Sequence, residues 1–174
     1  MDNNHAQFLV QYLTQLMEGE FPATRKVIAA VPDDKRTYRP DEKSRTAWEL
    51  ATHLALGDVW FLDSIVKGSF IYDPGAEELA RTQFGSITDV VAYYDREFPA
   101  HLAKVRALPT EKLTAVVDFF GMMQQPNATY LGFANNHSIH HRGQLASYLR
   151  AMGSKVPAIY GASADEPLAA AAGQ

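Results

Sequence analysis

Cysteine is absent from the 174-residue chain. Its absence excludes disulfide bonds, thiolate-ligated metals and cysteine nucleophiles, so any thiol chemistry must use a thiol from outside the chain. No apolar run approaches the ~18 residues that a membrane-spanning helix needs. The N-terminal residues (MDNNHAQF) also lack the basic segment and apolar stretch of a signal peptide. We therefore expect a cytoplasmic protein without a membrane span.

Basic residues are too few for a polyanion-binding surface. Lys and Arg number 16 against 20 Asp and Glu, which gives a formal net charge of −4, and no long block of like charge interrupts the sequence. Nucleic acids and anionic membranes bind basic faces, so neither is an expected partner. Hydrophobic residues at 47% and charged residues at 21% are the proportions of an ordinary globular protein, and the length predicts one domain.

Four segments carry apolar residues at helical spacing. The first includes Phe8, Leu9, Tyr12, Leu13, Leu16 and Met17, which predict one buried helix face, and its pattern resumes over residues 27–31 beyond Pro22. A capping box of Thr46 and Glu49 begins the second, which ends near Gly68. The third follows Ser86 or Thr88 and continues to Leu108, and the fourth runs from about Pro126 to Gly153.

The connections between these helices decide between two all-α folds. Residues 69–85 show no sustained period and predict a long crossing connection that has room for one short helical turn. Residues 113–123 (LTAVVDFFGMM) are expected to lie extended against the helices. Pro22 and Pro99 predict kinks. The pattern favours a four-helix bundle with a long crossover between helices 2 and 3; the alternative is an irregular all-α fold in which the two prolines end helices.

Histidine supplies the only unusual chemical signal. With His137 set at zero on a helical wheel of about 100° per residue, the apolar residues of the fourth helix average near 45°. His141 then lies at about 40°, in the centre of the predicted buried stripe, whereas His140 falls roughly 105° from that centre. His137 and His141 therefore form an inward i, i+4 pair, a spacing that lets two imidazoles bind one metal ion. Arg142 and Gln144 are compatible with surface positions.

His53 is a candidate partner on the second helix. It follows Leu50 by three positions and precedes Gly57 by four, so it is expected on the packed face, where Gly57 leaves room for a ligand or substrate. A single inward histidine is more often a hydrogen-bonded core residue, and that alternative stays open for His53 alone. His5, His101 and His140 are expected to be solvated or to lie behind the metal ligands.

The same residues carry a family resemblance. The run WELATHL (residues 48–54), followed far downstream by HSIHHRGQ (residues 137–144), resembles the DinB-like (YfiT-type) superfamily of metal-dependent enzymes. The likeness covers roughly residues 5–161. We therefore expect a single domain over residues 1–161, followed by an alanine-rich tail over residues 162–174.

The resemblance implies a four-helix bundle and one divalent metal, zinc or nickel, held by His53, His137 and His141. Characterised relatives include thiol-dependent transferases and isomerases that use bacillithiol, mycothiol or glutathione, and homodimers are common among them. The first hypothesis is thus a metal-dependent hydrolase or thiol S-transferase acting on a small molecule, in which a low-molecular-weight thiol is a possible cofactor. Glu49 and Asp58 are candidates for orienting a ligand or transferring a proton. The alternative is a non-catalytic, stress-related bundle that binds metal or a small molecule.

Overall fold

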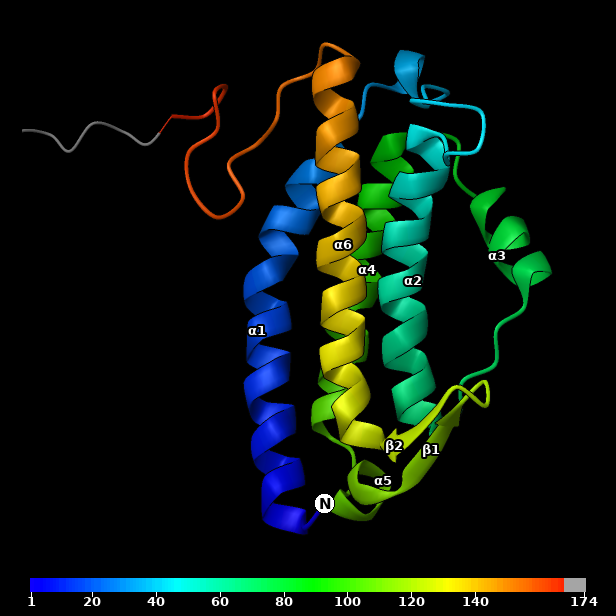
Figure 1. The fold of residues 1–174 in the computed structure, drawn as a ribbon, viewed down its shortest axis with the longest axis vertical. Coiled ribbons are helices and arrows are strands. Elements are labelled where there is room, and N and C mark those ends of the chain that lie inside the picture. Colours follow the sequence, from blue (N-terminus) through cyan, green and yellow to red (C-terminus); the bar gives the residue numbers. More distant parts are fainter. Residues whose placement is uncertain (168–174) are drawn as a thin grey trace, which may run out of the picture.

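Four long helices lie side by side along the length of the molecule (Figure 1). The computed structural model describes residues 1–167; residues 168–174 of the predicted tail lie outside this part. The long helices are α1 (Asn3–Ala29), α2 (Ala47–Lys67), α4 (Ile87–Arg106) and α6 (Tyr130–Ala151). The shorter elements are α3 (Pro74–Arg81), α5 (Thr110–Thr114), β1 (Val116–Phe119), β2 (Met123–Pro126) and two 3-10 turns (Asp33–Lys35 and Asn127–Thr129). The chain is thus an all-α bundle with one small hairpin.

The helix ends follow the capping signals of the sequence. Thr46 and Glu49 form a reciprocal capping box: the Thr46 hydroxyl accepts from the Glu49 backbone N–H (3.1 Å), and the Glu49 carboxylate accepts from the Thr46 N–H (2.7 Å). α2 ends at Gly68, whose φ of 72° is a left-handed conformation that glycine adopts without steric cost. Ser86 is the residue that caps α4, through a second box with Asp89.

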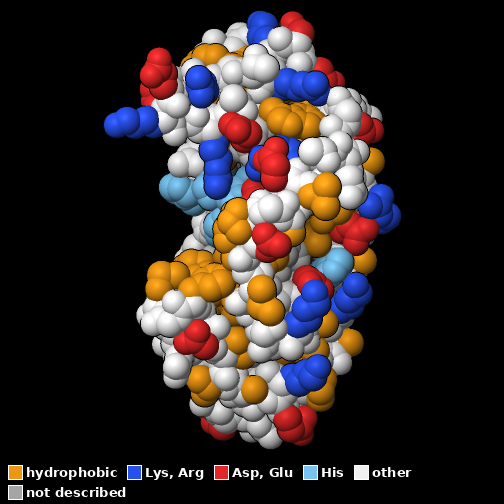
Figure 2. All heavy atoms as spheres, turned by 90° about the vertical axis from the view of Figure 1, so that its right-hand side faces the viewer, with side chains coloured by type: hydrophobic (Ala, Val, Ile, Leu, Met, Phe, Trp, Pro, Cys, Tyr) orange, Lys and Arg blue, Asp and Glu red, His pale blue; other side chains and the backbone are white. Residues whose placement is uncertain are grey.

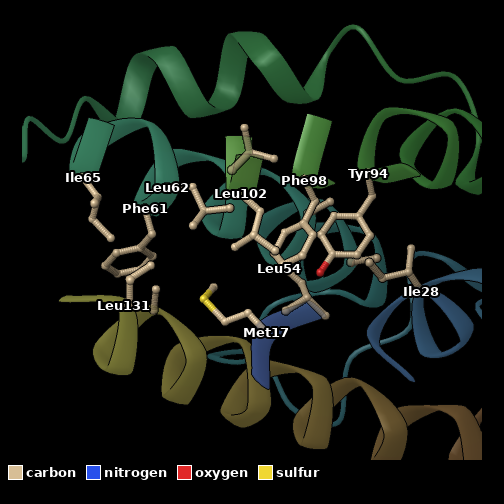
Figure 3. Packing of buried hydrophobic residues seen from close by; sticks show 14 of the residues in the cluster. Met17, Ile28, Leu54, Phe61, Leu62, Ile65, Tyr94, Phe98, Leu102 and Leu131 are labelled. Atoms are coloured by element: carbon tan, nitrogen blue, oxygen red, sulfur yellow. The ribbon is translucent and has the colours of Figure 1, made fainter. Parts of the chain in front are cut away.

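Each long helix packs against two others, so that the four surround one apolar core. α2 and α1 each contact both α4 and α6. Side chains from all four helices meet between them (Figure 3), among them Met17, Leu54, Leu102 and Leu131. Among the described residues, no helix combines the length and hydropathy that a bilayer crossing requires.

Neither proline ends a helix. α1 is continuous through Pro22 and α4 is continuous through Pro99, so the irregular alternative is wrong and the four-helix bundle is confirmed. An interior proline removes one backbone donor and crowds the preceding turn, but the buried residues on both sides of each proline pack into the same core and hold the helix together.

The predicted buried face of α1 is correct only in part. Met17, Val27 and Ile28 are buried, and Leu9 and Leu13 are half-buried against the core. Phe8, Tyr12 and Leu16 are instead 67%, 50% and 40% exposed. The other buried residues of the helix are Ala6, Val10, Thr14 and Thr24. The apolar pattern could not indicate Thr14 as a core residue, because threonine is polar. Thr14 tolerates burial since its hydroxyl donates to the Val10 carbonyl of the same helix (2.7 Å).

The long connection and the extended segment both contain regular structure. The crossover holds α3, whose N-cap Asp73 accepts from the Gly75 N–H (2.8 Å). Within residues 113–123, β1 forms an antiparallel pair with β2, in which Phe119 is opposite Met123. The fourth bundle helix begins at Tyr130 rather than near Pro126, because Pro126 is the last residue of β2.

Candidate metal centre

α2 and α6 bring His53, His137 and His141 together. Each offers one ring nitrogen, and these ligand atoms all lie within 4.8 Å of one another. The Nε2 atoms of His53 and His137 are 3.2 Å apart. Tetrahedral zinc with nitrogen ligands at about 2.0–2.1 Å would place neighbouring nitrogens roughly 3.3 Å apart. The His53–His137 pair already has this spacing, and the group of three could hold a metal ion.

Two of the histidines are oriented from behind by polar side chains. His53 Nδ1 donates to the Glu77 carboxylate of α3 (3.0 Å), and His141 Nδ1 donates to the Gln144 side-chain oxygen (2.8 Å). These bonds fix the tautomers and leave both Nε2 atoms as acceptors for a metal. His137 Nδ1 is buried and has no hydrogen-bond partner among the described residues.

Gly57 makes room for the His137 ring. A Cβ atom at this position would lie 3.1 Å from His137 Cε1, closer than ordinary van der Waals contact. The small residue that the sequence places one turn beyond His53 thus accommodates a cluster histidine.

The surroundings of His137 and His141 favour their neutral imidazoles. Burial, reinforced by neighbouring positive groups, lowers the pKa of His137 to about 3 and that of His141 to about 4. The hydrogen bond from His53 is the main cause that lowers the pKa of Glu77 to about 2. Metals bind neutral imidazole, so protons compete weakly for His137 and His141 near neutral pH.

The helical wheel placed the buried stripe of α6 incorrectly. The observed buried residues are Tyr130, Leu131, Ala134, Ser138, Arg142, Leu145 and Leu149. They average about 90° from His137 on the same wheel. His137 and His141 therefore lie at the edge of the stripe, beside α2, rather than at its centre, and both are only partly buried. The cluster accordingly faces a surface pocket and not the sealed core.

Arg142 is 1% exposed, which contradicts a surface position. Its guanidinium pairs with Glu20 of α1 (2.6 Å) and donates to the Thr24 hydroxyl (3.2 Å) and to Tyr160. These partners lie more than 100 residues upstream or beyond the end of α6, so the periodicity of one helix could not indicate them. Gln144 is exposed and contacts His141.

The two carboxylate candidates, Glu49 and Asp58, bond to residues outside the histidine cluster. Glu49 serves the capping box of α2. Asp58 is fully buried and accepts hydrogen bonds from Tyr94 and Ser138, 2.8 Å each. Among the described residues, the carboxylate that touches a cluster histidine is Glu77, which the sequence pattern did not predict. The local signal was Asp73 followed by proline, which suits the start of a helix but does not show which side chain reaches the site.

The remaining histidines have different positions. His140 is exposed, with its ring centroid 4.9 Å from that of His141, and exposed His5 bonds to Asp2. His101 was expected to be solvated or to lie behind the ligands. It is not solvated, because it is buried on α4 with 9% of its surface exposed.

A cavity of about 690 Å³ adjoins the histidines and runs beneath the crossover; we call it the crossover pocket. On this face of the molecule (Figure 2), histidine side chains border a hollow with hydrophobic side chains gathered below it. The lining residues come from α2, the crossover with α3, α4, the hairpin and α6: His53, Leu56, Gly57, Val59, Trp60, Phe61, Asp63, Ile71, Tyr72, Asp73, Ala76, Glu77, Ala80, Tyr93, Glu97, His101, Phe119, Phe120, Met122 and His137. The volume is within the range of small-molecule sites.

Known proteins resemble this chain in sequence and in fold. The sequence profile of the DinB family matches residues 1–169. Two Bacillus subtilis proteins, both named as uncharacterized, are similar in sequence: YrdA is 29% identical over 86% of this chain and 86% of its own length, and YjoA is 28% identical over 75% and 82%.

Solved structures share the fold. The crystal structure of DinB-like YjoA from B. subtilis superposes with a TM-score of 0.65 at 23% identity, covering 85% of this chain and 97% of its own. A DinB-like protein from Bacillus cereus gives a TM-score of 0.67 at 22% identity, covering 85% and 95%.

Proposed function

The chain belongs to the DinB family, and from its three-histidine cluster we propose that it is a metal-dependent enzyme. His53, His137 and His141 would hold one divalent metal, zinc or nickel. The reaction would be a hydrolysis or the transfer of a low-molecular-weight thiol, such as bacillithiol, mycothiol or glutathione, to a small-molecule substrate.

The observation that carries this proposal is the incomplete ligand set. Within the described residues, the cluster contains three histidines and no fourth protein ligand. Structural zinc sites are normally closed by four protein ligands, whereas catalytic sites keep a position for water or substrate. A bound divalent metal would supply a Lewis acid that lowers the pKa of a water or thiol in that position.

The residues around the cluster have separable tasks. Glu77 and Gln144 hold two imidazoles in their ligating tautomers. Tyr72 donates its hydroxyl proton to Glu77 (2.9 Å) and thereby helps to fix that carboxylate. The crossover pocket, which His53 and His137 also line, would bind the substrate next to the metal.

The test starts from protein purified without an affinity tag. Its metal content is measured, and the loaded protein is then incubated with each thiol plus an electrophilic fluorogenic acceptor, and separately with ester and amide substrates. The proposal predicts turnover in one of these assays and its loss in His141→Ala. A metal bound by four protein ligands, with no turnover, would instead support the non-catalytic, stress-related bundle.

A further inference from the structure

The crossover pocket has an apolar and aromatic surface. Trp60 and Phe61 of α2 face Ile71 and Tyr72 of the crossover, and the hairpin contributes Phe119 and Phe120. Trp60 is central to this surface: its ring lies within about 6.5 Å (centroid to centroid) of several other aromatic rings, and its indole N–H donates to the Ile71 carbonyl (3.0 Å). The indole therefore presents its rings, rather than a free donor, to a ligand.

Each carboxylate that lines the pocket already has a hydrogen-bond or ion-pair partner. Among the described residues, no lysine or arginine lines the cavity, whereas four carboxylates do: Asp63, Asp73, Glu77 and Glu97. Asp63 pairs with Lys67, and Glu97 with Arg96. Glu77 bonds to His53, and Asp73 caps α3. Away from the histidines, an anionic group would meet carboxylates and no lysine or arginine, and the apolar walls favour an uncharged ligand body.

Phe120 has a backbone conformation that few phenylalanines adopt. Its φ is 56°, and that of Gly121 is 71°, so both residues at the tip of the hairpin are left-handed. Glycine and asparagine are favoured at such positions, and a bulky side chain there is strained. The strain is not offset by full burial, because Phe120 is 44% exposed. Its ring instead stacks on Trp60 with planes 5° apart and centroids 6.4 Å apart.

We infer that the crossover pocket binds an uncharged small molecule with an aromatic or aliphatic body, and that Phe120 determines the specificity at its mouth. The assignment rests on the proposed function, since this molecule would be the substrate that meets the metal. Its polar end is directed toward His53 and His137 while its apolar body contacts Trp60 and the hairpin tip. Backbone strain is retained at position 120 because only an aromatic ring there completes the apolar wall.

Two fluorescent probes with one scaffold test the ligand class. N-phenyl-1-naphthylamine is uncharged, and 1-anilinonaphthalene-8-sulfonate adds a single negative charge. Titration of the whole protein should show saturable binding of the uncharged probe, with about tenfold weaker binding of the sulfonate. Absence of saturable binding, or equal affinity for the two probes, would overturn the assignment.

Variants at the hairpin tip test the role of Phe120. Phe120→Gly and Phe120→Asn should weaken binding of the uncharged probe about three- to tenfold, the range of one aromatic contact. Their melting temperatures should equal or exceed that of the unmodified protein, because both residues accept positive φ. Val116→Ala, which truncates an exposed apolar side chain of the same hairpin outside the pocket lining, is the matched control and should leave probe affinity unchanged. Unchanged affinity in both position-120 variants would overturn the role given to Phe120.

The pocket and the metal centre can fail separately. His141 belongs to the histidine cluster but does not line the pocket, so His141→Ala should bind the uncharged probe like the unmodified protein. Probe binding by a protein that takes up no metal would support the pocket and contradict the metal proposal. Metal uptake by a protein that does not bind the probe would support the metal proposal and contradict the ligand assigned to the pocket.

Discussion

Asp58 has the environment least suited to its charge. Its side chain is fully buried among the bundle helices, where one carboxylate oxygen accepts from Tyr94 and Ser138. The other oxygen has no partner among the described residues. Burial raises the pKa of Asp58 to about 7, although the two hydrogen bonds and Arg142 oppose this shift. Asp58 therefore gives the apo protein a pH-dependent stability.

We predict that Asp58→Asn flattens this dependence. In the folded protein the pKa is above its ordinary value of 3.8, so the stabilisation from protonated Asp58 is complete below about pH 4 and is lost as the pH rises through 7. At about 1.4 kcal/mol per pKa unit, the free energy of unfolding should fall by up to about 4 kcal/mol between pH 4 and 8. Asparagine carries no such titration.

Urea unfolding of the metal-free protein at several pH values measures this difference. Asp34→Asn, at an exposed position in a 3-10 turn, is the control and should follow the unmodified protein. An Asp58→Asn curve parallel to that of the unmodified protein would show that Asp58 does not titrate in this window.

Individual residues were predictable from sequence where their signal is local. The i, i+4 spacing and the family motif identify the three histidines that the structure brings together. Arg142 and Glu77 were not predictable in the same way, because Arg142 is buried by partners from α1 and the C-terminal segment, and Glu77 reaches His53 across 24 residues. Both depend on tertiary contacts that no helical period encodes.

Among the elements, the crossover helix α3 has a direct connection to the site. It presents Glu77 to His53, while Arg81, one turn later, pairs with both Glu77 and Glu78. Glu77 is 14% exposed and Glu78 is 66% exposed. The two adjacent glutamates thus share an arginine, but only Glu77 orients a cluster histidine.

We predict that Glu77→Ala lowers metal affinity by about ten- to a hundredfold, the usual effect of removing the carboxylate behind a ligating histidine. Glu78→Ala removes the neighbouring charge and should change affinity little. Competition titration with a chromogenic chelator measures both constants. Equal losses in the two variants would mean that α3 acts through its general charge and not through His53.

Helix type, both ends of α2 and the start of α4 were predictable because their signals are local: capping boxes, the glycine stop and apolar periods all lie within a few residues. The start of α6 was not, because a proline suits the end of β2 as well as a first helical turn. The hairpin was expected only as an extended segment, because strand pairing depends on where the partner strand lies. The buried face of α1 was predicted only in part, because Ala6 is small and Thr14 is polar, and only packing shows that they belong to the core.

At the scale of the whole molecule, α1 leaves an apolar face in solvent. Phe8 and Tyr12 stack with centroids 6.1 Å apart, and Leu16 continues the same face one turn later. Large exposed apolar side chains gathered on one face are typical of interaction surfaces. We expect a second copy of the chain to cover them, in keeping with the homodimer that the family resemblance implies.

Light scattering across micromolar concentrations should therefore give the mass of two chains. Tyr12→Asp should shift the mass toward one chain, because it introduces a charge into an apolar interface. Val116→Asp places the same charge at an exposed apolar position on β1 and should leave the mass unchanged. A single-chain mass for the unmodified protein would contradict the prediction.

The metal content of two neighbouring histidine variants tests the account most directly. His141 belongs to the three-histidine cluster, whereas His140 points about 100° away on the same helix. His140→Ala should retain about one metal per chain, as the unmodified protein should, while His141→Ala should lose most of it; circular dichroism shows whether both remain folded. Loss of metal in His140→Ala with retention in His141→Ala would contradict the proposed centre.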